Sequence, residues 1–334
     1  MTPEQTKTPE FSIIVPSRNR PGLVRRAVNS VLEQNHTALE VIVVNDGSDA
    51  EHEASYDALR ALDDRVRLLT LQRTPNGHGP SYAINRGADA ARGRFIGFLD
   101  DDDTWIDRSH LERVAQAHQE QPALDLYLCC QEAVRGEAPV TDALWLNGLA
   151  EHLEQRRAPN ARGEYPVVLD ELLICPTFAH LNTMIVRRQV YADCGAMDES
   201  IRYECEWDLY FRFLEHAREI LFFPGRIARH YVPDPTQRAN ASTVVSSLQK
   251  LSLRNRVMDK TLLFCESPAI RRRAGQVKSM TLKRLSQAMA AEGKWSQGFR
   301  YASEALVPGF NFKWLGYWGY LGCRVLVSRE HHED

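Results

Sequence analysis

The sequence lacks long apolar runs and any regular pattern of cysteines. No hydrophobic stretch approaches the roughly 20 residues that a helix needs to cross a bilayer, and the first ten residues have no apolar core of the kind that marks a secretory signal. The seven cysteines are irregularly spaced and form no CxxC pair. These absences argue against a disulfide framework or a zinc site and favour a reducing compartment. We therefore expect a cytoplasmic protein.

Glycine-rich phosphate-binding motifs are also missing. The chain contains neither the GxGxxG of dinucleotide-binding folds nor the GxxxxGK of a P-loop. A phosphate-bearing ligand would have to be held by other groups. No DNA- or RNA-binding motif is present, and the acidic body of the chain would repel a polyanion, so nucleic acid is not an expected partner.

The charge is distributed unevenly along the 334 residues. Residues 1–249 carry 26 Lys and Arg against 37 Asp and Glu, whereas residues 250–334 carry 15 against 7. Such a split suggests an acidic globular body and a basic tail with its own partner. We expect a flexible N-terminus over 1–10, a large domain over 11–235 and a basic, helical extension over 236–334.

Strand and helix patterns alternate through the first third of the chain. Apolar, β-branched runs predict strands at 11–16, 40–44, 66–71 and 95–99, and amphipathic stretches between them predict helices at 23–34, 50–62 and 81–91. This alternation predicts an α/β fold with a doubly wound, mostly parallel, Rossmann-like sheet. Residues 131–165 lose the periodicity, and we expect there a surface insertion that faces the substrate.

Four consecutive aspartates, Asp100 to Asp103, follow the predicted strand at 95–99. Adjacent carboxylates repel one another, and hard divalent ions bind carboxylate oxygens while keeping phosphates or waters as further ligands. Open α/β sheets bind ligands at the carboxyl ends of their strands. The run therefore predicts a metal–phosphate site, although on its own it is equally compatible with a solvated acidic turn.

A second acidic cluster precedes the helical pattern that begins at Trp207. Glu206 falls in the first turn, where the helix dipole favours an ionised carboxylate. Near a substrate, such a carboxylate is a ready general base. A charge that only stabilises the helix terminus fits the segment equally well, and Glu204 is an alternative base.

Four separated motifs, in this order and spacing, resemble family 2 glycosyltransferases, which are inverting enzymes of the GT-A fold. They are the strand–proline loop from 11 to 21, the strand end from Val43 to Ser48, the run from Phe98 to Trp105, and Glu206-Trp207-Asp208. The resemblance covers about residues 11–232. It implies a nucleotide-binding half over about 11–105 and an acceptor half over about 106–235.

The resemblance also implies roles for individual residues. Asp46 would accept a hydrogen bond from the base, typically uracil, and Asp100 and Asp102 match the family's DxD motif. Asp102 would ligate Mn²⁺ or Mg²⁺, and Glu206 would deprotonate the acceptor. The residues expected to bind the nucleotide sugar are Pro16, Ser17, Arg18, Asn19, Asp46, Asn85, Asp100 and Asp101, and the expected metal site comprises Asp102, Asp100 and His230.

Two positions depart from the family pattern. The expected base is Glu206, whereas the family usually has an Asp at this position, and the Glu side chain is one methylene longer. Ile84 replaces an arginine that often holds the donor, which leaves phosphate binding to Arg18, Arg86 or the metal. His78 and His180 fit either a ligand contact or a structural role, and a lone histidine more often has the latter.

The resemblance implies a metal-dependent inverting glycosyltransferase. Such an enzyme would move a hexosyl group from a nucleotide-diphosphate sugar to an acceptor hydroxyl in the synthesis of a cell-envelope polysaccharide or glycolipid. A UDP-sugar is the donor that we expect. A nucleotidyltransferase that forms nucleotide sugars is an alternative. A non-catalytic or degenerate nucleotide-sugar-binding protein is another.

The basic tail has an aromatic end. Residues 250–284 hold ten basic side chains, and residues 310–321 are rich in aromatics and leucine. Such a combination suits a membrane interface. We therefore expect a lipid-linked or glycan acceptor and a peripheral contact with an anionic inner leaflet. Packing of the aromatics against the catalytic domain is the alternative.

Overall fold

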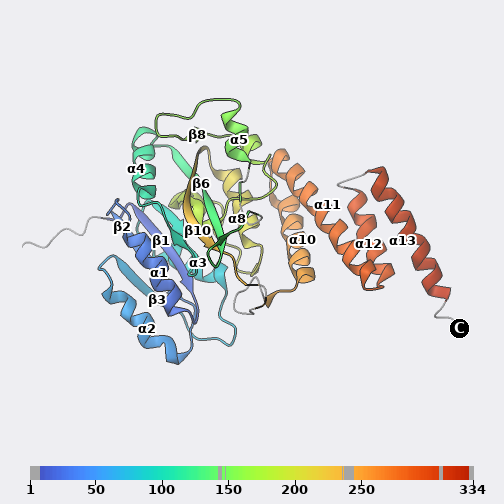
Figure 1. Cartoon of the computed structure of the whole chain (residues 1–334), viewed down its shortest axis with the longest axis horizontal. Helices are drawn as coiled ribbons and strands as arrows, with labels where there is room; N and C mark the ends of the chain where they lie inside the picture. Colours follow the sequence, from blue (N-terminus) through green and yellow to red (C-terminus); the bar gives the residue numbers. More distant parts are fainter. Residues whose placement is uncertain are drawn as a thin grey trace, which may run out of the picture. The chain divides into compact units, whose positions relative to one another are not determined.

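The computed structural model describes residues 8–141, 145–146, 148–234, 236, 244–307 and 311–330. The chain divides into two compact units, residues 1–234 and 235–334 (Figure 1). The N-terminal unit holds a mixed sheet and its covering helices, and the C-terminal unit is helical.

The N-terminal unit is built on one ten-stranded sheet. Its strands are β1 (Phe11–Ser17), β2 (Leu39–Asn45), β3 (Val66–Thr70), β4 (Phe95–Phe98), β5 (Thr104–Trp105), β6 (Leu124–Arg135), β7 (Ala138–Pro139), β8 (Tyr165–Pro166), β9 (Met184–Arg187) and β10 (Glu219–Tyr231). The main path runs β3-β2-β1-β4-β9-β6-β10-β5, with β7 beside β6 and β8 beside β10. Strands β1 to β4 are parallel, as are β6 and β10, whereas β9 is antiparallel to both of its neighbours. The mostly parallel sheet is confirmed.

Helices cover the sheet between the strands. They are α1 (Pro21–Leu32), α2 (Glu53–Asp57), α3 (Pro80–Ala90), α4 (His110–Glu120), α5 (Leu149–Glu154), α6 (Leu169–Leu172), α7 (Arg188–Asp193) and α8 (Cys205–His216). The helix predicted over 50–62 is α2 flanked by short 3₁₀ segments at 50–52 and 58–61.

The side chains of β1 alternate between two packed faces. Ile13 belongs to the core shared with α1 and α4. Ile14 points to the other face, where α3 approaches so closely that a Cβ on Gly87 would lie 2.5 Å from its Cγ2 atom. Because a strand sends successive side chains to opposite faces, these contacts explain why the sheet is covered on both sides.

The prediction of a surface insertion over 131–165 is wrong for residues 131–135, which belong to a strand. Strand β6 continues to Arg135, and residues from Gln131 to Val134 pair in parallel with β10. Their polar side chains hid the strand, because the pairing that fixes it lies about 95 residues further along the chain. The remainder includes β7, α5 and β8, and residues 142–144 and 147 lie outside the described part.

The described part of the C-terminal unit contains the helices α10 (Ser247–Phe264), α11 (Pro268–Ala291), α12 (Trp295–Leu306) and α13 (Phe312–Glu330), which confirms the predicted helical extension. Trp314 and Leu321 of α13 are buried in a core with residues of α11 and α12. The indole N–H of Trp314 donates to the carbonyl oxygen of Ala302 at 3.0 Å. None of the described helices is both long and apolar enough to span a bilayer. Phe310, part of the aromatic segment, lies outside the described residues.

Candidate active site

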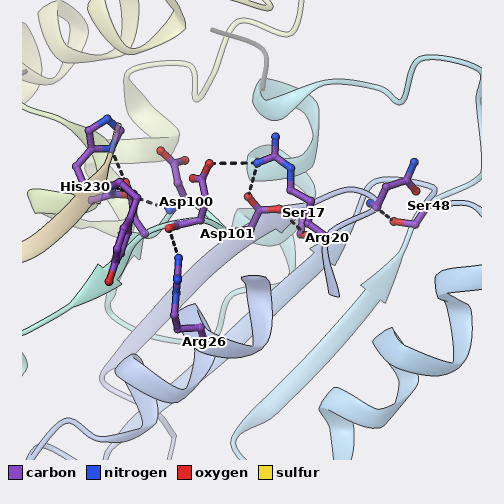
Figure 2. Close-up of polar contacts among 12 residues, drawn as sticks. Ser17, Arg20, Arg26, Ser48, Asp100, Asp101 and His230 are labelled. Carbon is purple, nitrogen blue, oxygen red and sulfur yellow. Dashed lines mark hydrogen bonds and ion pairs between the residues drawn. The ribbon is translucent and has the colours of Figure 1, made fainter. Parts of the chain in front are cut away.

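Polar loops meet at one edge of the sheet. Ser17 ends β1, Asn45 ends β2 and is followed by Asp46, and the aspartate run follows β4. These three strands are parallel, so their carboxyl ends lie side by side. The structure thereby brings together three motifs that are far apart in the sequence (Figure 2).

Arg20 reaches two carboxylates of the aspartate run. Its Nη1 atom lies 3.1 Å from Oδ1 of Asp101 and 3.2 Å from Oδ2 of Asp102, as Figure 2 shows. The hydroxyl of Ser17 donates to the other oxygen of Asp101 at 2.7 Å. A guanidinium therefore offsets part of the negative charge that the sequence gathers here, a role that the sequence analysis did not assign to Arg20.

The aspartates that face the site resist ionisation. Burial, together with the neighbouring Asp102, raises the pKa of Asp101 to about 6, although Arg20 and Ser17 act in the opposite direction. Burial and then the charges of Asp103 and Glu206 raise the pKa of Asp100. Asp102 has a raised pKa for the same reasons, burial first and Asp103 second. A cation bound among them would favour the ionised forms.

Asp103 anchors the cluster. It is fully buried, and its Oδ1 atom accepts the backbone N–H of Tyr231 at 2.8 Å. Its Oδ2 atom lies 2.8 Å from Nδ1 of His230 and also accepts the side-chain amide of Asn182. Burial alone would raise the pKa of Asp103, but the hydrogen bond and charge of His230 lower it. The same pairing raises the pKa of His230 against the effect of burial.

Among the residues that the structure describes, two groups of side chains could hold a metal ion. Asp100, Asp102 and Asp103 form one, and Asp103, His180 and His230 form the other, with ligand atoms within 4.8 Å of one another in each. The first offers only carboxylate oxygens, which suit Mn²⁺ or Mg²⁺. The predicted ligands Asp100 and Asp102 thus lie together. His230 lies in the second group, with Asp103 and His180, and its role as a metal ligand stays a prediction.

Glu206 lies in the first turn of α8, as predicted. His180 stands between it and the aspartates: its Nε2 atom is 3.6 Å from Oε1 of Glu206 and 3.8 Å from Oδ2 of Asp100. The Nδ1 atom of His180 accepts the backbone N–H of Asn182 at 3.3 Å, so in the neutral ring the proton is on Nε2. Burial lowers the pKa of His180 and favours this neutral form.

The loop after β1 is tied to the loops after β2 and β3. Arg18 donates to the carbonyl oxygens of Thr74 and Pro75, each at 3.1 Å. Asn19 has a positive φ of 57°, and its backbone N–H donates to Ser48 at 2.8 Å (Figure 2). Pro16 lies in β1, opposite Val44 of β2.

Asp46 fixes the turn that precedes α3. Its carboxylate accepts the backbone N–H groups of His78 and Gly79 at 2.9 Å, and the Nδ1 atom of the His78 ring lies 2.7 Å from it. Gly77 has φ +61°, and a Cβ there would lie 2.6 Å from Oδ2 of Asp46. His78 therefore has a structural partner, and the contact of Asp46 with a base stays a prediction.

Asn85 is not brought to the aspartate cluster. Its side chain donates to Met197 and Glu199 and accepts from Tyr191 and from the backbone of Met197. These bonds hold the segment before α8 against α3. Arg86, a predicted substitute for phosphate binding, lies 3.1 Å from Asp89 and 3.5 Å from Glu199.

Sequence reasoning missed Arg20 and Asn182 and left His180 undecided. Arg20 stands in the loop after β1, where a cation next to predicted ligand residues was the available signal. His180 and Asn182 belong to the short 3₁₀ segment before β9, and no motif marks them. Trp145 lies against both histidines, with ring centroids 4.5 Å from His180 and 5.3 Å from His230.

Residues 12–170 match the family model described as glycosyl transferase family 2. This segment, just under half of the chain, is therefore similar to glycosyl transferase family 2. The match includes the loops after β1 and β2 and the aspartate run.

Two relatives illustrate the similarity of this chain to known proteins in sequence. It is 38% identical over 95 residues to the GalNAc(5)-diNAcBac-PP-undecaprenol beta-1,3-glucosyltransferase of Campylobacter jejuni, covering 28% of this chain and 30% of that protein. It is 28% identical over 223 residues to the succinoglycan biosynthesis protein ExoW of Rhizobium meliloti, covering 64% and 62%. The matched segments thus span less than two thirds of either relative.

Solved structures share the fold. The S. aureus TarS fragment 1–349 in complex with UDP-GlcNAc superposes with a TM-score of 0.63 at 19% identity, covering 90% of this chain and 81% of that one. The mannosyltransferase PcManGT from Pyrobaculum calidifontis, in complex with GDP-Man and Mn²⁺, gives 0.55 at 14% identity, covering 95% and 86%. The chain therefore has the GT-A architecture.

Proposed function

We propose that this protein is an inverting glycosyltransferase that depends on Mn²⁺ or Mg²⁺. It transfers a hexosyl group from a nucleotide-diphosphate sugar, most readily a UDP-sugar, to an acceptor hydroxyl during the synthesis of a cell-envelope polysaccharide or glycolipid. The observation that carries this proposal is the position of Glu206, whose carboxylate lies 3.6 Å from the same Nε2 atom of His180 that is 3.8 Å from Asp100.

That arrangement supplies what a single displacement requires. Glu206 takes the proton from the acceptor hydroxyl as that oxygen attacks the anomeric carbon. The neutral ring of His180, with its proton on Nε2, lies 3.6 Å from Oε1 of Glu206, and the backbone N–H of Leu181 donates to the same oxygen at 3.4 Å. One displacement with one base inverts the anomeric centre, and no covalent sugar–enzyme intermediate is needed.

Asp100 and Asp102 would hold the divalent ion. When bound, such an ion offsets the charge that develops on the leaving diphosphate. Arg20 neutralises part of the remaining charge on Asp101 and Asp102. His230, held by Asp103 through Nδ1, has only Nε2 left for a ligand and faces the diphosphate as a cation.

The donor pocket is formed by the loops after β1 and β2, with Pro16, Ser17, Arg18, Asn19 and Asp46. A uracil base is supported by Asp46 and by the structural likeness to TarS, whose structure contains UDP-GlcNAc. Asn85 contributes indirectly, since its bonds to Tyr191 and Met197 position the segment that leads to Glu206.

The acceptor is a glycan or a lipid-linked sugar, and the C-terminal unit contacts the membrane. The name of the Campylobacter relative places an undecaprenol diphosphate on its acceptor, which supports this choice of acceptor class. The basic charge of the C-terminal helices supports the membrane contact.

Release of nucleoside diphosphate from a panel of UDP-, GDP- and dTDP-sugars tests this function. We expect slow hydrolysis of one donor with Mn²⁺ and none after EDTA. Formation of a nucleotide sugar from sugar phosphate and nucleoside triphosphate would instead indicate the nucleotidyltransferase. Donor binding without release of diphosphate, even with acceptor extracts, would indicate the degenerate binding protein.

A further inference from the structure

The last helix of the C-terminal unit has two apolar faces. One carries Trp314 and Leu321, which are buried against the preceding helices. On the other, apolar or glycine positions recur at intervals of three or four residues, so they share one face of the helix. They are Phe312, Leu315, Gly316, Gly319, Tyr320, Cys323, Leu326 and Val327, which we call the outer face of α13.

This outer face is exposed. Phe312 is 82% exposed, Leu326 65%, Tyr320 and Val327 each 51%, and Leu315 37%. Scattered exposed hydrophobic residues are normal, but a continuous apolar stripe along about four turns of one helix marks an interaction surface. Within its unit α13 is the last of the helices and packs against α12 through the opposite face (Figure 1).

The charges around the outer face identify its partner. Lys313 and Arg324 are exposed, and at 100° per residue they lie along one edge of the stripe. No acidic residue occurs in α13 before Glu330. Between residues 244 and 330 the sequence has fifteen Lys and Arg against five Asp and Glu, so this unit attracts a negatively charged surface.

We propose that the outer face of α13 lies in the interfacial region of an anionic lipid bilayer. The apolar side chains enter the boundary between head groups and acyl chains, and the basic edge pairs with lipid phosphates. Apolar burial and electrostatic attraction are the two contributions that together give stable interfacial binding. A second copy of this chain is a poorer partner, because docking α13 on itself would bring two basic units together.

The inference specifies the membrane contact proposed above and rests on that proposal, but it does not depend on the chemistry at the aspartate cluster. It can therefore fail while the transferase function stands. Release of nucleoside diphosphate from a soluble donor should be unchanged by substitutions on the outer face, and its measurement alongside membrane binding separates the two claims.

Co-sedimentation of the full chain with vesicles tests the inference. We expect binding to phosphatidylglycerol–phosphatidylcholine vesicles, much weaker binding to pure phosphatidylcholine, and a fall in binding as salt increases. The double variant Tyr320→Glu, Leu326→Glu should bind at least roughly tenfold more weakly, because it places charges in the apolar stripe. Met280→Glu, which puts the same charge at an exposed apolar position of α11, is the matched control and should bind like the parent.

Two results would overturn the inference. One is equal binding by the double variant and the control, with both showing the parent's far-ultraviolet circular dichroism. The other is failure of the parent to bind anionic vesicles. Concentration-dependent association seen by light scattering and lost in the double variant would assign the outer face to a second copy of the chain.

Discussion

The Nε2 atom of His180 lies 3.6 Å from Oε1 of Glu206. The same nitrogen is 3.8 Å from Oδ2 of Asp100, so one buried imidazole separates the proposed base from the proposed metal site. Since Nδ1 of His180 accepts a backbone N–H, the ring presents an N–H to both carboxylates. This relationship connects two motifs that are about 100 residues apart in the sequence.

Replacing Glu206 by Gln should lower kcat by about 10²- to 10⁴-fold, the usual contribution of a general base. The amide keeps the size of the side chain but cannot accept the proton, so donor binding should be retained. Glu204→Gln is the matched control. Glu204 caps α8 in the left-handed conformation, with φ 66°, and its substitution should change kcat by no more than about threefold. If the loss occurred at Glu204 instead, that residue would be the base.

His180→Gln tests a positioning role. We expect kcat to fall by about 10- to 100-fold while KM for the donor changes little, because a misdirected base harms the reaction more than binding. The pH dependence of kcat should shift as well, since Glu206 loses the imidazole N–H that lies 3.6 Å from its carboxylate. A variant with lower thermal stability but with the kcat and pH profile of the parent would show that His180 has a structural role and does not position Glu206.

Asp101 should make the metal-free protein less stable as pH rises. Its folded pKa of about 6 lies above the ordinary aspartate value of 3.8, so the stability that it contributes is present below about pH 4 and lost as pH rises through 6. The shift corresponds to about 3 kcal/mol. Urea unfolding in EDTA at pH 4.5 and 7 checks this. Relative to the parent, Asp101→Asn should gain stability at pH 7, and a constant difference between the two proteins would contradict it.

Gly77→Ala should weaken donor binding through Asp46. The substitution has two costs, a positive φ and a Cβ that would lie 2.6 Å from the Asp46 carboxylate. Gly136→Ala has only the first, since Gly136 has φ +63° with no atom within 4 Å of its Cβ position. Both variants should lose about 1 kcal/mol of stability, but only Gly77→Ala should raise donor KM, by about tenfold. Equal donor KM values for the two variants would indicate that Asp46 does not contribute to donor binding.

The periodicity of apolar residues predicted those helices and strands that form from residues close together in the sequence. Strands β1 to β4 and the helices between them follow from apolar periodicity, and the parallel pairing follows from their alternation. The antiparallel strand β9 could not be derived this way, because its place between β4 and β6 depends on partners that are distant in the sequence. The full length of β6 was hidden for the same reason.

Some residues of the candidate site could be predicted from the sequence, and others could not. The aspartate run and Glu206 carry charges in recognisable positions, so their residue types alone suggested chemistry. Arg20, His180 and Asn182 take their significance from contacts with those acids. No spacing in the sequence predicts such contacts, since Arg20 reaches the acids through the pairing of β1 with β4, and His180 and Asn182 reach them through the pairing of β9 with β4.

The most direct test of the account is the metal dependence of nucleoside diphosphate release in the parent, Asp102→Asn and Asp64→Asn. Asp64 is an exposed carboxylate just before β3 and serves as the control. We predict that the parent and Asp64→Asn require Mn²⁺ or Mg²⁺ and lose activity in EDTA, and that Asp102→Asn is at least roughly 100-fold slower at any metal concentration. Equal rates with Mn²⁺ and with EDTA, or full activity of Asp102→Asn, would contradict the proposed metal site at the aspartate cluster.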